Sequence, residues 1–471
     1  MNAFILWFNY FVLGYYTVTS LIYVFLLIVA FFVIVKHLHR LKYAGYQEWI
    51  HPSASPPVSI IIAAYNEEKG IVETVNSLFL MDYPSFEIIV ASDGSTDSTL
   101  PNLVRAFGLK RIDLIYRPII PTSGVRGFYV NPLRPNLTVI DKEHGGKSDS
   151  MNVGINAARS PYFCSIDADS VLERDALTRL MRPIIEEPEI VKATGGIVRI
   201  VNGCAVKDGN ISAVGIPKSR LARFQVIEYV RSFLFGRTGW SAINSLLILS
   251  GTFSMFNKRV VQSVGGYNTN TVTEDMELVV KVHRFLMDSD EKYKIVFVPD
   301  PICWTEVPEN MKMLARQRRR WHTGLGESLY LHRSMLFNPR YGTVGLFAMP
   351  YQLLIEFFGP LVEVSGYFVI AYSFAAGLVD WQFFSLFLVV AILFGVFLST
   401  GAILLEEMTY KRYPKIADFA KLMLYGLLEN FGYRQMTVLW RAEAAIKFFF
   451  KGKKKWEVVV KKGFRKAGEG A

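Results

Sequence analysis

Cysteine is scarce in this chain of 471 residues, which contains only Cys164, Cys204 and Cys303. Their number is odd, they lie far apart, and they lack the spacing of metal ligands, so neither a disulfide framework nor a cysteine-based metal site is expected. A reducing compartment fits this usage. Hydrophobic residues make up 51% of the chain and aromatic residues 14%, which is high for a soluble protein.

Positive charge is concentrated near the end of the chain. The formal net charge is +11, and the segment from Arg441 to Lys466 holds ten lysine or arginine residues and two glutamates, a net of +8. Aromatic residues lie among these cations, so we expect residues 441–471 to form a basic tail on an anionic membrane surface, in the cytoplasm. A nucleic-acid arm or a disordered solubilising tail are the alternatives. No nucleic-acid-binding module accompanies the tail, so no nucleic-acid partner is expected.

A long apolar run opens the chain. Residues 4–35 are almost wholly apolar and predict one spanning helix, near Thr17 to Val35, because about twenty apolar residues cross the hydrocarbon core. Cations follow at once, which places residue 36 onward in the cytoplasm. No charged residue precedes the run and no small-residue cleavage site follows it, so residues 1–50 are predicted to be an anchor rather than a signal peptide.

Apolar stretches return after residue 342, and those at 345–378 and 383–405 are long enough to span a membrane. Glu356 and Glu363 within the first stretch are costly in lipid, so we expect them to face protein, water or a polar passage. Alternatively, the first part of that stretch lies at the interface and spanning begins near Pro360.

A third stretch, residues 416–439, is interrupted by polar residues. If it spanned once, the basic tail would lie outside, against the positive-inside rule, so an interfacial or re-entrant segment is predicted. Residues 343–440 are therefore expected to form transmembrane and interfacial helices. The whole chain is predicted to be a multi-pass protein of the plasma (inner) membrane, with a cytoplasmic catalytic domain.

Between the apolar ends, a pattern of strand, polar loop and helix occurs three times. Apolar runs at 58–64, 86–92 and 162–166 each end in such a loop, which predicts an α/β domain with a mostly parallel sheet at residues 51–308. Ligands of such sheets bind at the carboxyl ends of the strands. Four prolines between residues 117 and 138 predict an irregular loop there.

Two further segments are predicted to be helical. Residues 219–247 are apolar on one face, as in a helix lying against a membrane. Residues 309–342 include a basic amphipathic helix, Met311 to His332, which suits the cytoplasmic interface.

Four charged clusters follow one another through this region. They are Gly145-Gly146-Lys147, Asp167-Ala168-Asp169, Thr273-Glu274-Asp275 and Gln317-Arg318-Arg319-Arg320-Trp321. Each one supplies something needed to transfer a sugar from a nucleotide diphosphate: a cation, metal ligands, a base, and a group that grips phosphate and stacks on sugar. Asp167 and Asp169 share one side of an extended segment, because side chains alternate, and their oxygens suit Mg²⁺ or Mn²⁺.

The order and spacing of these clusters resemble those of inverting family 2 glycosyltransferases embedded in membranes, a type that includes hyaluronan, cellulose and poly-N-acetylglucosamine synthases. The resemblance covers residues 58–321. It implies a GT-A fold and processive, metal-dependent synthesis of a β-linked exopolysaccharide, such as a biofilm polymer, from a UDP-sugar. UDP-N-acetylglucosamine is favoured and UDP-glucose is next. The growing polysaccharide is the acceptor, and its passage outward through the membrane helices is expected.

The resemblance also assigns nucleotide-binding residues. Ala64, Tyr65 and Glu67 match the first nucleotide loop, where the aromatic ring packs by the uracil and the acid contacts the nucleoside. Asp93 matches the acid that reads the uracil or the ribose, and Lys147 matches the diphosphate lysine. The alternatives are local: Glu67 can stabilise a helix N-terminus, and Asp93 can cap a helix.

At the reaction centre, the resemblance implies that Asp169 binds the metal and Asp167 the sugar or nucleotide. Asp275 matches the base that takes the acceptor proton, and Glu274 is grouped with the acceptor and diphosphate residues. The alternative for this triplet is a capping box with Thr273 as the cap.

Acceptor residues follow from two further matches. Gln317, Arg320 and Trp321 match the Q-x-x-R-W signature of processive enzymes, in which arginine holds diphosphate and tryptophan stacks on the terminal sugar. Gly251, in Ser250-Gly251-Thr252-Phe253, matches a turn at the acceptor entrance, with a core strand as the alternative. Cys303 to Glu306 are similar to a segment that flanks the acceptor. Trp321 can otherwise be an interfacial aromatic residue.

Two other functions remain as alternatives. A non-processive enzyme would add one sugar to a lipid acceptor, and product length separates it from a polymerase. A catalytically silent receptor for a nucleotide sugar would lack one of the chemical residues, and none is missing. Two or three passes make a narrow wall for a polymer, which leaves room for an accessory subunit or a homo-oligomer.

Overall fold

The computed structural model describes residues 2–43, 55–116, 118–207, 209–379, 381–410, 413 and 415–450. These residues form two compact units. The sheet unit contains the described residues among 38–215 and 244–307, and the helical unit those among 1–37, 216–243 and 308–459. Residues 216–243 lie inside the predicted catalytic domain but belong to the helical unit.

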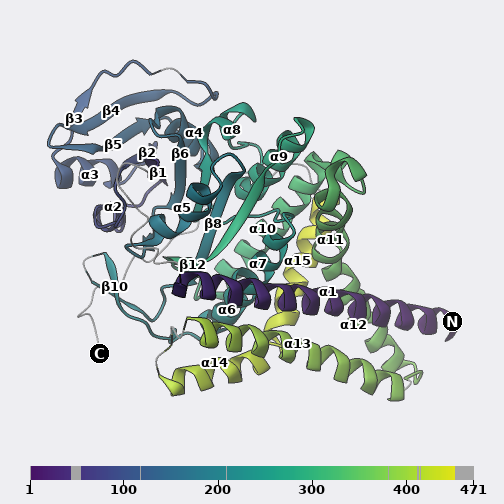
Figure 1. Cartoon of the computed structure of the whole chain (residues 1–471). Coiled ribbons are helices and arrows are strands. Elements are labelled where there is room, and N and C mark those ends of the chain that lie inside the picture. The colour runs from purple at the N-terminus through teal and green to yellow at the C-terminus, as the bar shows by residue number, and fades with distance from the viewer. Residues whose placement is uncertain are drawn as a thin grey trace. The chain divides into compact units, whose positions relative to one another are not determined.

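Ten strands of the sheet unit form one sheet, in the order β3-β4-β5-β2-β1-β6-β11-β8-β12-β7 (Figure 1). Their bounds are Val58–Ala64 (β1), Phe86–Asp93 (β2), Lys110–Ile112 (β3), Val125–Asn131 (β4), Arg134–Lys142 (β5), Tyr162–Asp167 (β6), Ser170–Leu172 (β7), Val191–Ile200 (β8), Phe253–Asn257 (β11) and Lys294–Thr305 (β12). Strands β5, β2, β1 and β6 are parallel, as are β8 and β12. The predicted fold class and the three predicted strands are confirmed. A separate hairpin joins β9 (Ala205–Lys207) to β10 (Asn210–Ala213).

The central strands are mostly apolar and almost wholly buried, as expected for a sheet on which helices pack. Ile60, Ile61 and Ile62 of β1 have no exposed surface. Helix α4 (Lys147–Ala157) packs on β1 and β2, and α5 (Ala176–Glu186) packs on β8 and β12. The other helices of this unit are α2 (Ile71–Leu78), α3 (Thr99–Phe107), α8 (Lys258–Ser263) and α9 (Glu274–Asp288).

The prediction of an irregular loop at residues 117–138 is wrong, because most of this segment forms the hairpin of β4 and β5. Its prolines avoid the positions where an N–H is needed. Pro132 lies in the turn between the paired residues Asn131 and Arg134. Pro135 precedes Leu137, where pairing with β2 begins, so its missing N–H costs that ladder nothing.

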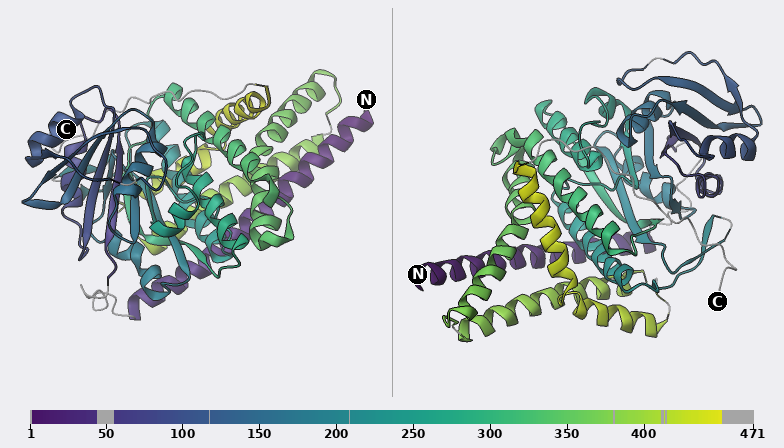
Figure 2. Two further views of the ribbon diagram at one scale, coloured as in Figure 1. Left: turned by 90° about the horizontal axis from the view of Figure 1, so that it is seen from above. Right: turned by 180° about the vertical axis from the view of Figure 1, so that it is seen from behind.

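In the helical unit, three stretches among the described residues are long and apolar enough to cross a membrane: Ile5–Leu41, Val344–Ala375 and Phe384–Thr409. The first lies within α1 (Asn2–Tyr43), one uninterrupted helix in Figure 2. The other two agree with the predicted stretches. The second consists of the short segments η5 (Val344–Ala348), α11 (Met349–Tyr351) and η6 (Gln352–Phe357) and of α12 (Gly359–Ala375), and the third lies within α13 (Trp381–Thr409).

The interrupted stretch after α13 forms two helices, α14 (Ile416–Leu428) and α15 (Tyr433–Phe450). Of the polar residues that interrupt the sequence, Glu429 and Asn430 lie at this break, and Arg434 and Gln435 lie in the first turn of α15. The predicted basic tail contributes residues 441–450 to α15, and the rest of it lies outside the described residues.

The segment predicted to be helical at 219–247 ends at Ala242. It consists of α6 (Arg220–Tyr229), the π-helical η2 (Val230–Arg237) and α7 (Thr238–Ala242). The predicted amphipathic helix is α10 (Met311–Leu331), which begins where the Asn310 side chain accepts a hydrogen bond from the N–H of Lys312, at 2.8 Å.

Partly buried ion pairs join segments of the helical unit that are far apart in the sequence. Arg231 in η2 donates to Ser399 Oγ at 2.8 Å and forms an ion pair with Glu429. Glu356 accepts from Tyr23 Oη at 2.7 Å and from Arg441 at 2.9 Å.

Glu363 lies 3.3 Å from Arg434 and accepts from Tyr367. The expectation that Glu356 and Glu363 face protein, water or a polar passage rather than lipid is thus confirmed for both, and protein is what they face.

Candidate active site

The candidate active site lies at the carboxyl ends of β1, β2 and β6 in the sheet unit. The register pairs Ala64 with Ser92 and Ala63 with Asp167, so these three strands end side by side. The loops that follow therefore gather the predicted residues at one edge of the sheet.

The loops after β1 and β2 are bonded to each other. Asn66 has a left-handed backbone, φ 57°, and its side chain accepts from the N–H of Thr96 at 2.9 Å. The N–H of Glu67 donates to Thr99 Oγ1 at 2.8 Å. The predicted nucleoside residues Tyr65 and Glu67 thus flank a fixed asparagine that the sequence analysis did not single out, although asparagine tolerates this conformation well.

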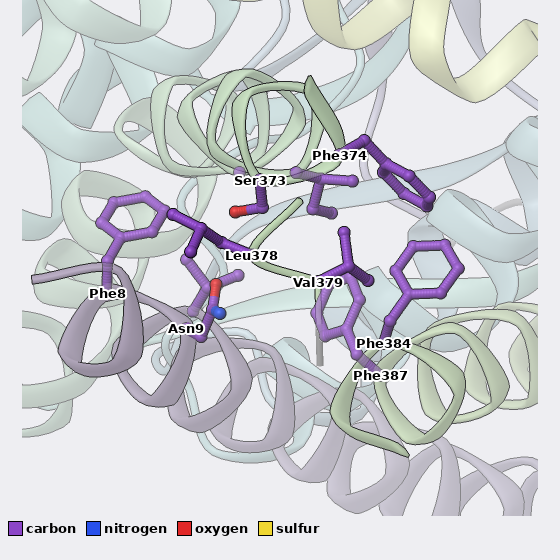
Figure 3. A pocket seen from close by; sticks show the side chains of 11 residues that line it. Phe8, Asn9, Ser373, Phe374, Leu378, Val379, Phe384 and Phe387 are labelled. Carbon is purple, nitrogen blue, oxygen red and sulfur yellow. The ribbon is translucent and has the colours of Figure 1, made fainter. Parts of the chain in front are cut away.

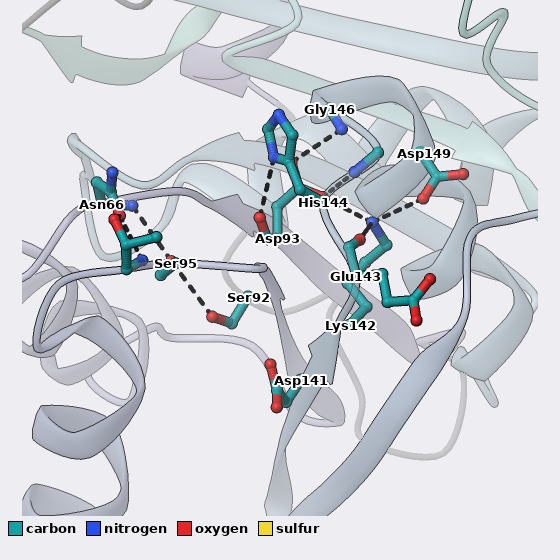
Figure 4. Close-up of polar contacts among 12 residues, drawn as sticks. Asn66, Ser92, Asp93, Ser95, Asp141, Lys142, Glu143, His144, Gly146 and Asp149 are labelled. Atoms are coloured by element: carbon teal, nitrogen blue, oxygen red, sulfur yellow. Dashed lines mark hydrogen bonds and ion pairs between the residues drawn. The ribbon is translucent and has the colours of Figure 1, made fainter.

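Asp93 ends β2 and is almost fully buried, with 2% of its surface exposed. Its Oδ1 accepts from Lys142 Nζ at 2.6 Å and from the N–H of Gly145 at 2.9 Å, and its Oδ2 accepts from the N–H of Gly146 at 2.9 Å. Figure 4 shows these bonds. Burial acts to raise the pKa of Asp93, but Lys142 and the loop N–H outweigh it and lower the pKa.

Lys142 was not predicted as a site residue, yet it connects two parts of the site. It has no exposed surface and forms a second ion pair, with Asp149 of α4, at 2.7 Å (Figure 4). Asp149 also accepts from the N–H of Ser123 at 3.0 Å. The helix-cap alternative for Asp93 is not what forms, since Asp97 accepts from the N–H of Thr99, the first residue of α3.

His144 was also missed, and it lies between Asp93 and Tyr65. Its Nδ1 is 2.9 Å from Asp93 Oδ2, and its ring centroid is 4.6 Å from that of Tyr65. Gly94 permits this approach. It has φ 64°, and a Cβ there would lie 2.9 Å from the backbone N of His144.

Lys147, the predicted diphosphate cation, opens α4 among carboxylates. Its Nζ lies 2.7 Å from Asp167 and 3.2 Å from Glu274. Burial acts to lower the pKa of Lys147, but these two carboxylates outweigh it and raise the pKa. The lysine is therefore charged in the folded protein.

Asp275, the predicted base, lies in the first turn of α9. Its Oδ2 accepts from the N–H of Gly251 at 3.1 Å, and its Oδ1 from the N–H of Met276 at 2.9 Å. Burial and the neighbouring Glu274 raise its pKa, while Lys147 acts to lower it, so the carboxylate is a stronger base than an exposed aspartate. The Thr273 side chain makes no capping bond, so the capping-box alternative does not form.

A Cβ at Gly251 would lie 3.3 Å from both Lys147 Nζ and Asp275 Cβ, a tight contact that glycine avoids. The same turn holds Thr252, whose Oγ1 donates to Asp167 Oδ2 at 2.9 Å. The alternative for this segment was a core strand. That strand is β11, which begins only at Phe253, so Gly251 lies before it. Trp304 belongs to the segment from Cys303 to Glu306 that was predicted to flank the acceptor. It lies in β12 and has no exposed surface.

The carboxylates near Lys147 are suitable ligands for a divalent cation whose coordination is completed by phosphate oxygens of the donor. Asp167, Glu274 and Asp275 lie around Lys147, and Asp169, 7% exposed, lies in the turn between β6 and β7. Such a surplus of negative charge repels an anionic diphosphate unless a metal ion neutralises it. Within the described ranges, no group of three His, Cys, Asp or Glu side chains is placed to hold a metal.

The Q-x-x-R-W residues lie on α10 in the helical unit. Arg318 and Arg319 are bound within that unit, to Glu228 at 2.8 Å and to Glu443 at 2.7 Å. Gln317 Oε1 and Arg320 Nε are buried and have no hydrogen-bond partner in the described part of the chain.

Gln317, Arg320 and Trp321 share one helix face, because residues three and four apart are neighbours. Trp321 is 36% exposed, and the Arg318 guanidinium lies 4.5 Å from its ring.

A pocket in the helical unit carries no such chemistry. Figure 3 shows Phe8 and Asn9 of α1 near Ser373 of α12 and Phe384 of α13. None of the residues that line it is charged, so it does not suit a nucleotide diphosphate.

Comparison with known proteins gives the chain a context. The sequence profile of the family described as "Glycosyltransferase like family 2" matches residues 56–324, more than half of the chain. A poly-beta-1,6-N-acetyl-D-glucosamine synthase of Staphylococcus epidermidis is 29% identical over 273 residues, and one of Staphylococcus aureus (strain COL) is 27% identical over 272 residues. These alignments cover 58% of this chain and 55% of each relative. The chain thus spans about half the length of the curated relatives it matches.

A solved structure supports the fold. The mannosyltransferase PcManGT from Pyrobaculum calidifontis, in complex with GDP-Man and Mn²⁺, aligns with a TM-score of 0.51 at 18% identity, over 87% of this chain and 99% of that one. At this identity the likeness concerns the fold alone, and it agrees with the GT-A-type sheet described above.

Proposed function

Because the chain belongs to glycosyltransferase like family 2, we propose that it polymerises a β-linked polysaccharide from a UDP-sugar, with inversion at the anomeric carbon. UDP-N-acetylglucosamine is the favoured donor, since the relatives named above are poly-N-acetylglucosamine synthases. UDP-glucose is the next candidate. The proposal places the sheet unit in the cytoplasm and the three candidate spans in the membrane.

The observation that carries the proposal is the cluster of Lys147 with Asp167, Glu274 and Asp275. Lys147 provides positive charge for the leaving diphosphate. Asp275, with its raised pKa, takes the proton from the acceptor hydroxyl while the oxygen attacks the anomeric carbon and the bond to UDP breaks. A single base and no covalent intermediate give inversion.

In this proposal, the donor's nucleoside lies along the loops of Ala64, Tyr65, Glu67 and Asp93, whose geometry is fixed by hydrogen bonds. Asp169, together with phosphate oxygens, would hold Mg²⁺ or Mn²⁺. When bound, the metal neutralises charge on the departing diphosphate.

Gln317, Arg320 and Trp321 serve the acceptor and the diphosphate. The support is that the two arginines between Gln317 and Arg320 are bound within the helical unit, whereas Gln317 Oε1 and Arg320 Nε are not. An indole can hold each new terminal sugar by stacking without demanding one arrangement of hydroxyl groups. Repeated addition at the same site then produces a polymer, which we propose leaves through the membrane helices.

The test is incubation of the purified full chain in detergent with a panel of UDP-sugars, with and without Mg²⁺ or Mn²⁺, while UDP release and product size are measured. We expect metal-dependent UDP release with one sugar and a long product. A product limited to one added sugar on lipid would instead establish the non-processive alternative. Absence of UDP release with every UDP-sugar would reject the proposal.

A further inference from the structure

The pocket between α1, α12 and α13 contains a buried polar group that the proposed reaction does not use. Ser373 is 7% exposed, and its hydroxyl oxygen makes no hydrogen bond with any residue that the structure describes. The amide of Asn9 lines the same pocket, and no other side chain in the lining is polar (Figure 3). An unpaired hydroxyl among apolar side chains is costly at membrane depth, so the pocket suits a ligand that carries a hydrogen-bond acceptor.

The two polar residues belong to the same end of the helical unit. Tyr23 of α1 donates to Glu356 of η6 at 2.7 Å. Further along, a Cβ on Gly366 of α12 would lie 3.8 Å from the Val12 side chain of α1. The first and second candidate spans are therefore antiparallel, so the start of α1, with its asparagine, lies at the same end as the last turn of α12, with its serine.

Exposed tryptophans mark this end as a membrane interface. Trp7, two residues before Asn9, is 76% exposed, and Trp381, at the start of α13, is 64% exposed. The Trp381 ring centroid lies 5.5 Å from that of Phe374, the neighbour of Ser373. Tryptophan is enriched where headgroups meet hydrocarbon, and Asn9 is only about 3 Å further along the helix axis than Trp7. Both polar groups thus lie at the depth of the lipid ester groups.

The deeper part of the pocket is apolar and narrow. Val12, Gly366, Ile370 and Phe387 line it further from the interface. The cavity measures about 40 Å³, a few times the 10–15 Å³ or so that one water molecule needs, so it admits a slender chain rather than a helix. Phe374 in the lining is 45% exposed, so the pocket reaches the surface of the helices, where lipid can enter.

We propose that this pocket binds one ester-linked acyl chain of a membrane phospholipid. The hydroxyl of Ser373 and the amide of Asn9 donate to ester carbonyl oxygens, and the acyl chain extends into the apolar part of the pocket. The chain itself gains little by leaving the bilayer, because both surroundings are apolar, so the two polar groups provide the selectivity. The inference rests on the proposed function only in that the three candidate spans lie in a membrane.

The test compares two lipids that differ only in the carbonyl oxygens. Delipidated full chain in detergent is titrated with a diester phosphatidylglycerol or with its diether analogue, and the rise in unfolding temperature reports binding. The wild type should bind the diester about tenfold more tightly, as expected from two hydrogen bonds of modest strength. Ser373→Ala and Asn9→Leu should each lower this ratio by about threefold, and the double variant should show a ratio of about one.

Ser365→Ala is the matched control. It removes a hydroxyl from the same helix, but Ser365 donates to the carbonyl oxygen of Val362 at 2.8 Å and does not line the pocket, so the wild-type ratio should remain. In lipid-free detergent, Ser373→Ala should unfold at the wild-type temperature or above it, because it removes a buried hydroxyl that has no partner among the described residues. Ser373→Ala alone decides if Asn9→Leu fails to fold.

Equal binding of the two lipids by the wild type would overturn the inference, because lipid would then coat the helices without ester recognition. A wild-type ratio that survives in the double variant would also overturn it and would place the ester groups elsewhere. Ester preference in a protein that transfers no sugar would reject the proposed reaction but not this site. Sugar transfer without ester preference would reject this site alone.

Discussion

Asp275→Asn is the substitution that tests the proposed chemistry most directly. Asp275 accepts one hydrogen bond on each oxygen, from the N–H of Gly251 and of Met276. An asparagine amide has one acceptor oxygen, so one of these N–H groups loses its partner. Lys147 keeps its ion pairs with Asp167 and Glu274, so the cation for the diphosphate stays in place.

Two magnitudes follow from this geometry. Loss of a general base lowers turnover by about 10²-fold to 10⁴-fold, which corresponds to about 3–5 kcal/mol in the activation free energy. Loss of one hydrogen bond at a partly buried N–H lowers the free energy of unfolding by about 1–2 kcal/mol. UDP affinity should stay within about threefold of the wild type, because no group assigned to UDP is removed.

The assay compares UDP release, UDP affinity and thermal unfolding for the variant and for Asp288→Asn. The control makes the same chemical change at the other end of α9, where Asp288 lies 3.7 Å from Arg284 in a part-exposed pair. Exposed pairs of this kind contribute little to stability, so the control should behave as wild type. Turnover of Asp275→Asn within threefold of that control would refute the assignment of the base.

Three further predictions concern the metal, the acceptor and a buried histidine. Asp169→Ala should weaken metal-dependent UDP binding, since a hard cation loses a carboxylate, and full wild-type activity in excess chelator would contradict a metal role. Trp321→Ala should stop elongation while UDP binding persists, because the stacking surface is lost, and long product on sizing would instead favour an interfacial role for Trp321. Burial lowers the pKa of His283 from 6.5 to about 4; the unfolded chain therefore binds a proton first on acidification. The free energy of unfolding should fall by up to about 3 kcal/mol between pH 6.5 and 4, and a loss equally large in His283→Gln would show another cause.

The sequence predicts those parts of the fold that local pattern determines. The runs that became β1, β2 and β6 are mostly apolar, and polar side chains lie where each one ends, so both the strands and the sheet edge that carries the candidate site follow. The prolines before and within the β4–β5 hairpin account for the wrong loop prediction, because proline disfavours a strand only where its N–H is needed for pairing. That depends on which strand lies alongside, and the sequence does not state it.

The prediction of the candidate site succeeded for residues whose type and motif agree. It missed residues whose contacts are distant in the sequence. Lys147, Asp167, Glu274 and Asp275 do meet in the structure. Lys142 was missed because a lysine at the end of a strand is ordinarily exposed, and its two carboxylate partners are visible only in three dimensions. His144 lies beside Gly145-Gly146, and its contacts with Asp93 and Tyr65 are likewise visible only in three dimensions.

The helical unit is assembled from segments that the ribosome synthesises at widely separated times. Arg231 emerges long before its partners Ser399 and Glu429, which lie 168 and 198 residues further along. Until these partners are synthesised, the η2 segment exposes a cation and apolar surface that the folded protein covers. A nascent chain in this state is prone to aggregate or to need a chaperone. A fragment cut to residues 51–308 would remain permanently at that stage. We expect such a fragment to be insoluble, whereas a full chain inserted during its synthesis can complete the buried pair.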